Sequence, residues 1–217
     1  MKLHLGCGQR YLNGYINIDF PLTEHSVQEK TVADLHADIL KLQYPSGSIE
    51  EVRLHHVFEH FTRPVACALV AGWNSWLAPR GTLHIEVPDF YRTALAIISP
   101  LTSGSRKAVA ERHLFGSHEA HWAAHYEGYT VASLSDLMNE FGFKVVQVKK
   151  NKWCGTYNFE LIVQKTSDKY SLEESTGRAQ NYLSKFLLDE SEGELSLLDT
   201  WLDVYRKHVD LCWTNDR

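Results

Sequence analysis

The sequence predicts a doubly wound α/β fold, and the order of its apolar segments is the main reason. The apolar run Lys2-Leu3-His4-Leu5 ends in the turn Gly6-Cys7-Gly8, and a second run, Tyr15-Ile16-Asn17-Ile18, ends on Asp19. A glycine turn after one strand and an acid after the next are typical of α/β proteins that bind a ribose-bearing cofactor. Further along, residues 49–87 predict a strand, a helix and another strand in that order. An ordinary tight turn of a hairpin, with Asp19 in solvent, is the alternative.

Length and composition narrow the class of protein. A chain of 217 residues, 44% hydrophobic and 23% charged, predicts one domain, with or without an appendage, and a sizeable core. No apolar run reaches the roughly 20 residues that cross a bilayer. We therefore expect no membrane partner. The first residues lead directly into a strand without a signal-like segment, which predicts a cytoplasmic protein.

Charge and cysteine spacing exclude further classes. The net charge is −5 and the sequence has no basic run, so we do not expect a nucleic acid as the main partner. The cysteines at positions 7, 67, 154 and 212 form no Cys-x-x-Cys pair, so neither a zinc knuckle nor a disulfide framework is expected. We expect reduced thiols.

The first half of the chain after Asp19 predicts alternating strands and one helix. Residues 33–39 are typical of a short strand or turn, and residues 49–56 of a strand that enters the core. Apolar side chains at spacings of three and four predict a helix over residues 63–77, stopped by Pro79-Arg80-Gly81. Residues 82–87 alternate in polarity and predict a strand that opens into a loop at its carboxyl end.

The second half predicts another helix over residues 133–141 and two closing strands over 144–148 and 159–164. From Ser171 onward the pattern is helical and amphipathic. We therefore predict a cofactor-binding domain over residues 1–168 and a helical extension over 169–217. The extension would pack on the domain, form a lid or make a homodimer interface, because its apolar face needs cover.

Several motifs, in this order, resemble those of class I S-adenosylmethionine-dependent methyltransferases. They are Leu3-His4-Leu5-Gly6-Cys7-Gly8, Asn17-Ile18-Asp19, Ala37-Asp38-Ile39, His56-Val57-Phe58-Glu59-His60, Trp76-Leu77-Ala78-Pro79-Arg80-Gly81 and Ile85-Glu86-Val87-Pro88-Asp89. The resemblance covers residues 2–165 and is strongest to a small bacterial group of predicted methyltransferases. It implies a Rossmann-like sheet and S-adenosyl-L-methionine as the cofactor.

The resemblance also implies which residues line the cofactor site: Gly6, Cys7, Gly8, Asp19, Asp38, Ile39 and His55. The glycines would lie against the methionine part of the cofactor, and Asp19 would bind the ribose hydroxyls. Asp38 with Ile39 would face the adenine. His55 or His56 would line the cleft where the cofactor meets the substrate.

Three departures from the family pattern matter. His4 stands where many members carry an acid, and Leu77-Ala78-Pro79-Arg80-Gly81 replaces the usual turn. The segment from Gly8 to Asp19 is too short for a helix with its loops, so an abbreviated first crossover is expected. Tyr11 occupies the position of the third glycine of a dinucleotide motif, which disfavours NAD.

Methyl transfer requires a base with a pKa near neutrality, and the 12 histidines offer candidates. His56 ends a core strand, and His125 begins a segment that resembles a substrate-side motif, so we predict either as the catalytic base. The acceptor would be an oxygen or nitrogen of a small molecule or glycan. Phe115, Trp122, Tyr126 and Tyr129 would line its pocket or belong to the core. A regulatory or scaffold protein that binds the cofactor without catalysis is the alternative.

A metal site is a separate hypothesis. His56-x-x-Glu59-His60 matches the zinc motif of inverzincin peptidases, provided that the segment is helical. Some small-RNA 2′-O-methyltransferases carry a similar Glu-x-x-Glu-His motif that, with a later histidine, holds a divalent ion. His118, His121 or His125 would complete such a site and would share one face of a helix. We predict no metal; the candidate ligands are His56, Glu59, His60 and His121.

Overall fold

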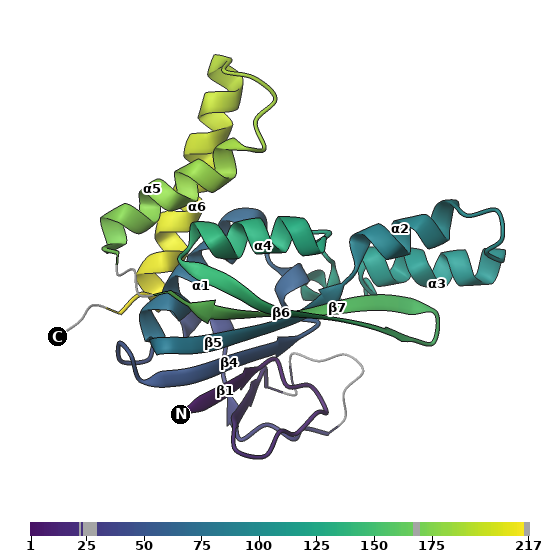
Figure 1. Ribbon diagram of the computed structural model, residues 1–217, viewed down its shortest axis with the longest axis horizontal. Coiled ribbons are helices and arrows are strands. Elements are labelled where there is room, and N and C mark those ends of the chain that lie inside the picture. Colours follow the sequence, from purple (N-terminus) through teal and green to yellow (C-terminus); the bar gives the residue numbers. More distant parts are fainter. Residues whose placement is uncertain (22, 24–29, 167–169, 215–217) are drawn as a thin grey trace.

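The computed structural model describes residues 1–21, 23, 30–166 and 170–214. Its centre is a seven-stranded sheet with the order β3-β2-β1-β4-β5-β7-β6 (Figure 1). The strands are β1 (Lys2–Leu5), β2 (Ile16–Asp19), β3 (Leu35–His36), β4 (Ile49–His55), β5 (Leu77–Pro88), β6 (Phe143–Trp153) and β7 (Thr156–Lys165). Strand β7 is antiparallel to both of its neighbours, and the other pairs are parallel. The predicted Rossmann-like sheet is confirmed.

The helices are α1 (Arg63–Trp76), α2 (Phe90–Ile98), α3 (Gly104–Phe115), α4 (Val131–Glu140), α5 (Leu172–Ser184) and α6 (Glu192–Cys212), with short 3₁₀ turns η2 (Ile39–Lys41), η3 (Phe58–His60) and η4 (His121–Ala123). Helices α1, α4, α5 and α6 lie where helices were predicted, whereas α2 and α3 were not predicted. The closing strands β6 and β7 extend beyond the predicted ranges because they pair along one long hairpin. Strand β5 likewise begins earlier than predicted, at Leu77.

Helices α1, α4, α5 and α6 lie on one side of the sheet (Figure 1). The strand residues that face them are apolar and buried, among them Leu3, Leu54 and Leu83, each 0% exposed. The intervening residues point to the opposite side and are mostly polar, which agrees with the two-residue period of a strand. The sheet therefore has one apolar face and one polar face.

The first crossover is abbreviated, as predicted. Residues 6–15 join β1 to β2 through turns, and no α-helix precedes Arg63 in the described part of the chain. The last helix, α6, packs along α1 and against η2. Trp76 Nε1 donates a hydrogen bond of 2.6 Å to the Cys212 carbonyl, and a Cβ at Gly72 would collide with the Cys212 side chain. The C-terminal helix thus closes the core over α1.

The predicted domain boundary between residues 168 and 169 lies outside the described residues. Across the residues that are described, no helix is both long and apolar enough to span a bilayer.

Candidate functional site

The glycine loop after β1 has the backbone that the sequence predicts. Gly6 and Gly8 adopt φ angles of +65° and +54°, which strain any residue with a Cβ. A Cβ at Gly6 would collide with the side chain of Val57, so this glycine allows two loops to approach each other. A Cβ at Gly8 would meet nothing within 4 Å. Open space beside Gly8 leaves room for a ligand.

Asp19 ties this loop to β2. Its Oδ2 accepts a hydrogen bond of 2.8 Å from the Gly8 amide, and its Oδ1 accepts one of 2.9 Å from the Phe20 amide. Cys7, between the glycines, is buried, and burial with the nearby Asp19 charge raises the pKa of its thiol to about 11. The loop therefore offers backbone groups and a neutral thiol rather than a nucleophile.

Asp38 and Ile39 lie at the start of η2. Asp38 Oδ1 accepts a hydrogen bond of 3.0 Å from the Leu40 amide and so caps this turn, while Lys41 lies 3.4 Å from its other oxygen. Ile39 is 7% exposed and belongs to the hydrophobic core. Asp38 keeps a partly open carboxylate, whereas Ile39 offers a ligand little surface.

His55 belongs to a chain of hydrogen bonds on the polar face of the sheet. Arg53 Nε donates to His55 Nε2 at 3.1 Å, so His55 Nδ1 carries a proton and donates to His4 Nε2, also at 3.1 Å. His4 Nδ1 in turn donates to Asn17 Oδ1 at 3.0 Å. Burial, together with Arg10 and Arg53, lowers the pKa of His55 to about 3. Both imidazoles are neutral. His4 therefore does not replace the negative charge of the acid that many family members carry at this position.

His56 follows β4 directly and adopts φ +54°, a conformation that is uncommon for residues other than glycine. Its Nδ1 lies 3.1 Å from Glu59 Oε1, and its Nε2 lies 3.7 Å from Glu86 Oε1. Burial lowers the pKa of His56, but the two carboxylates outweigh burial and raise it to about 9. His56 is therefore an imidazolium at neutral pH and cannot accept a proton.

Glu59, His60 and His125 form the group best placed to bind a cation, because one ligand atom from each lies within 4.8 Å of the others. Glu59 is 1% exposed, and its Oε2 has no hydrogen-bond partner. His60 Nδ1 donates to the Ala124 carbonyl at 3.1 Å, and His125 Nδ1 donates to the Leu114 carbonyl at 3.2 Å. Both Nε2 atoms thus keep a free lone pair.

The structure corrects two expectations about the later histidines. Residues 118–125 do not form one helix, since only His121–Ala123 makes a 3₁₀ turn and His118 has φ +58°. His121 is exposed and lies outside the group, whereas His125 completes it. After this turn the chain forms no helix until Val131, and the Tyr126 amide donates to the Glu59 carbonyl at 2.9 Å.

The inverzincin hypothesis fails on the same segment. Both histidines of that motif must share one helical face, but His56 has a left-handed backbone and only Phe58–His60 forms a 3₁₀ turn. His56 is also absent from the cation-binding group.

A cavity of about 570 Å³ lies beside His56 and His125. Its walls include His113 and residues that sequence reasoning missed: Glu86, Arg112, Asn151, Trp153 and Asn158. His113 Nε2 lies 2.7 Å from Asn158 Oδ1, which joins α3 to β7. A volume of this size suits a small molecule or one sugar unit. The motif that ends β5 contains Glu86, but only the pairing of His55 with Glu86 reveals its place.

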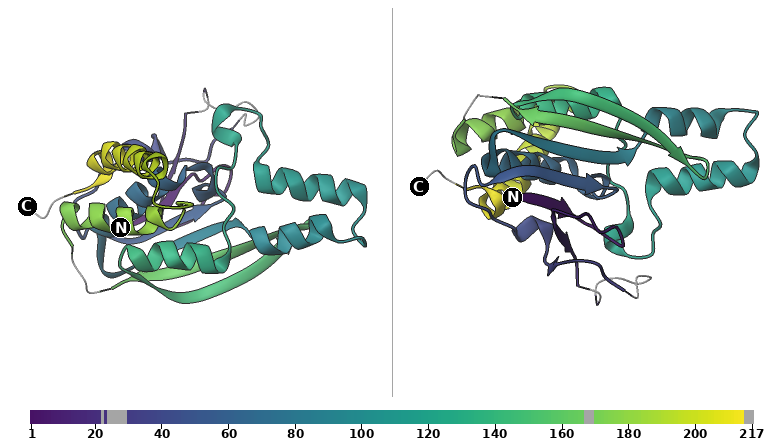
Figure 2. Two further views of the ribbon diagram at one scale, coloured as in Figure 1. Left: turned by 90° about the horizontal axis from the view of Figure 1, so that it is seen from above. Right: turned by 60° about the horizontal axis from the view of Figure 1, so that its bottom comes forward.

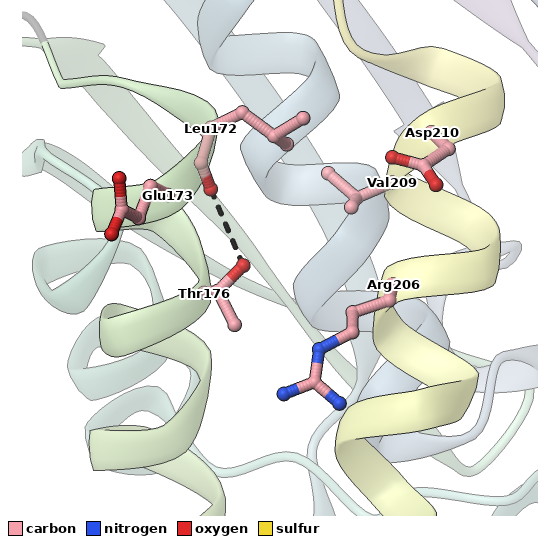
Figure 3. A pocket seen from close by; sticks show the side chains of 6 residues that line it. All are labelled: Leu172, Glu173, Thr176, Arg206, Val209 and Asp210. Carbon is pink, nitrogen blue, oxygen red and sulfur yellow. Dashed lines mark hydrogen bonds between the residues drawn. The ribbon is translucent and has the colours of Figure 1, made fainter.

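A second cavity, of about 450 Å³, lies between α5 and α6 (Figure 3). It is lined by Leu172, Glu173, Thr176, Arg206, Val209 and Asp210. These helices are at the end of the molecule opposite the α2–α3 hairpin (Figure 1), and none of the predicted site residues lines this cavity.

Comparisons with known proteins agree on the fold. No protein-family model matches the sequence, and no curated protein matches it significantly. The 1,6-didemethyltoxoflavin-N1-methyltransferase of Burkholderia thailandensis, solved with 1,6-didemethyltoxoflavin and S-adenosylhomocysteine, matches with a TM-score of 0.52 and 14% identity over 76% of this chain and 71% of that chain. An S-adenosylmethionine-dependent methyltransferase from Mesorhizobium loti matches with a TM-score of 0.50 and 12% identity over 76% and 90%. The fold is that of class I methyltransferases.

Proposed function

We propose that this protein transfers a methyl group from S-adenosylmethionine to an oxygen or nitrogen of a small-molecule or glycan acceptor. One observation carries the proposal: the open space at Gly8 follows β1, and the cavity at His56 follows the adjacent strand β4. Methyl transfer is an in-line displacement that needs donor and acceptor side by side. The Burkholderia thailandensis enzyme, which has a similar fold and was solved with S-adenosylhomocysteine, supports the choice of donor.

In this proposal the residues of the glycine loop, Gly6, Cys7 and Gly8, contact the methionine part of the cofactor. Asp19 binds the ribose hydroxyls, because its carboxylate accepts hydrogen bonds and lies at the end of β2, where it contacts the Gly8 amide of the glycine loop. Asp38 approaches the adenine. His55 is fixed by its hydrogen bonds to Arg53 and His4, and His4 belongs to β1, which leads into the glycine loop.

We propose His125 rather than His56 as the base. Burial lowers the pKa of His125, so that its imidazole is neutral at pH 7, and its Nε2 lone pair is free. His56, protonated and paired with two carboxylates, would orient the acceptor instead. The acidic limb of a pH–rate profile should disappear in His125→Gln, whereas an unchanged profile would remove His125 from the chemistry.

Isothermal titration with S-adenosylhomocysteine tests the cofactor site. Gly8→Ala should weaken binding at least about tenfold because its methyl group enters the ligand space. Gly14→Ala is the matched control: Gly14 has φ +82° and equally open surroundings, yet lies outside the proposed site. No binding by the wild type, or unchanged binding by Asp19→Ala, would refute the proposal.

A non-catalytic regulator predicts a different result. It would bind S-adenosylhomocysteine in the same titration but form no methylated product from phenols, amines or glycans supplied with labelled S-adenosylmethionine. The free buried thiols of Cys7, Cys67 and Cys212 suit a reducing compartment, and we propose a cytoplasmic location.

A divalent cation bound by Glu59, His60 and His125 is a second candidate feature of the site. The buried Oε2 of Glu59 without a partner favours it, and both imidazoles are oriented by carbonyls in the way that metal ligands usually are. A bound ion would act as a Lewis acid on the acceptor oxygen. His125 would then be a ligand and not the base.

Titration calorimetry with Mn²⁺ and Zn²⁺ separates these two roles of His125. Cation binding that is lost in His60→Ala and kept in His121→Ala would establish the metal site, since His121 is an exposed histidine outside the group. Absence of binding by the wild type would leave His125 as the base.

A further inference from the structure

Helices α2 and α3 form an arm, residues 90–115, that projects beyond the carboxyl ends of the sheet (Figures 1 and 2). The two helices pack mainly on each other, and their main contact with the sheet is at β7. In α2, Thr93 is the one buried residue. Most of the surface of α2 is therefore open to a partner.

The open surface of α2 is apolar. Tyr91, Leu95 and Ile98 recur at spacings of four and three, which places them on one face of the helix. They are 63%, 46% and 72% exposed, and Leu101 in the loop at the tip is 94% exposed. An exposed apolar stripe along a projecting arm is typical of a docking surface.

Two cationic side chains follow this stripe at the start of α3. Arg106 and Lys107 lie in the first turn of α3, directly after the Leu101 loop, and their side chains make no hydrogen bond or ion pair with the described residues. In contrast, Arg92 at the base of the arm is held by Asp89 and two carbonyls. The whole chain carries a net charge of −5, so the positive charge at the tip of the arm is opposite in sign to that of the protein as a whole.

We infer that the α2–α3 arm docks on an anionic lipid surface, with Ile98 and Leu101 in the interfacial layer and Arg106 and Lys107 against the headgroup phosphates. Apolar side chains flanked by cations are the combination that binds anionic bilayers without spanning them. The earlier expectation of no membrane partner rested only on the lack of a spanning segment.

Other partners fit less well. Single-stranded nucleic acid is bound through aromatic stacking, but the most exposed residues of the tip, Ile98 and Leu101, are aliphatic. A symmetric dimer through two arms would bring Arg106 and Lys107 of one copy against the same cations of the other.

The arm also connects the surface to the cavity. Val109 and Arg112 of α3 line the cavity beside His56. Docking at the tip would therefore bring the cavity close to an acceptor held at the bilayer. This inference does not depend on methyl transfer and is tested without it.

Flotation with vesicles tests the inference. The wild type should bind vesicles of phosphatidylcholine with phosphatidylglycerol, bind pure phosphatidylcholine at least about tenfold more weakly, and lose affinity as salt rises. Leu101→Ser should lower affinity about tenfold. Leu188→Ser is the matched control, because Leu188 is 91% exposed between α5 and α6, away from the arm.

The cationic part has its own variant. Arg106→Gln/Lys107→Gln should remove the preference for phosphatidylglycerol, with a loss of about 20-fold or more. Equal binding by both vesicles, or equal effects of Leu101→Ser and Leu188→Ser, would overturn the inference. So would tighter binding of polyuridylate than of vesicles at the same salt, or a wild-type dimer that Leu101→Ser dissociates in size-exclusion chromatography. Circular dichroism checks that each variant is folded.

Discussion

The two faces of the central sheet come from the same strands but are held together by different forces. On the face that carries the helices, the side chains are apolar and at most 1% exposed: Leu54, Ile85 and Leu161. The residue before each of these points to the other face, and these residues are polar: Arg53, His84 and Glu160. One face is stabilised by exclusion of water, the other by pairing of charges.

The polar face explains how this sheet is stable with helices on only one side. Parallel strands are usually covered on both faces and are apolar throughout. Here Arg53 Nη2 and Lys149 Nζ donate to the two oxygens of Glu160 at 2.8 and 2.9 Å, and His84 Nδ1 lies 3.5 Å from the same carboxylate. Tyr15 donates to Glu51 further along. Paired side chains across four strands let this face tolerate water, which makes a short first crossover permissible.

Leu54→Ala gives the largest expected effect, because it removes a fully buried side chain from the apolar face. We expect a loss of about 3 kcal/mol in the free energy of unfolding, measured in urea. Glu50→Ala in the same strand is the control, because its exposed ion pair with the amino terminus should contribute little to stability. A loss below about 1 kcal/mol for Leu54→Ala would mean that the helix-covered face is not the main source of stability.

The second largest effect is expected from acid, which should lower the free energy of unfolding by protonating Glu160 on the polar face. The imidazole of His84, then Lys149 and Arg53, lower the pKa of Glu160 from 4.5 to about 2, despite burial. A folded-state pKa below the unfolded value contributes stability that is complete above pH 4.5 and is lost as the pH falls towards 2. We expect about 2 kcal/mol from this group after screening. Glu160→Gln should flatten urea midpoints over this range; an equally steep decline would show that other carboxylates cause it.

Arg53→Met tests whether the polar face is stabilised by its charges or only by side chains that fill the same space. The single variant should cost about 1–2 kcal/mol, because Glu160 is 6% exposed and loses one cation while Lys149 remains. Arg53→Met combined with Glu160→Leu should recover most of that loss in the same urea assay, since an apolar pair often replaces an ion pair at no cost. If the double variant is no better than the single one, the whole network of charges is required.

Part of this contrast was predictable from the sequence. The alternation in Ile49-Glu50-Glu51-Val52-Arg53-Leu54-His55 predicts a strand with one apolar side, and the short link from Gly8 to Asp19 predicts the missing crossover helix. The partners on the polar side were not predictable. Glu160 comes from an antiparallel strand 107 residues after Arg53, and only the register of β5 and β7 brings them together.

The candidate site divides in the same way. Local spacing identified His56, Glu59 and His60, which the chain places in one turn. It offered His118, His121 or His125 as the third ligand on the assumption of helical spacing. Only His121–Ala123 makes a 3₁₀ turn, and His125 is the one of the three that lies close to Glu59 and His60. The choice between His56 and His125 as base also depended on Glu86, whose charge reaches His56 only through strand pairing.

His56 provides the smallest expected effect and tests where the two faces meet, at the carboxyl ends of β4 and β5. Its pKa is raised from 6.5 to about 9, so its contribution is complete below pH 6.5 and is lost as the pH rises through 9, the reverse of Glu160. Because its side chain is 38% exposed, we expect only about 0.5 kcal/mol after screening. His56→Gln in EDTA, which removes any cation from Glu59, should abolish the alkaline decline of urea midpoints, and His121→Gln should keep it. A decline that survives in His56→Gln would mean that Glu59 and Glu86 do not hold this histidine protonated, and His56 would regain its place as a base.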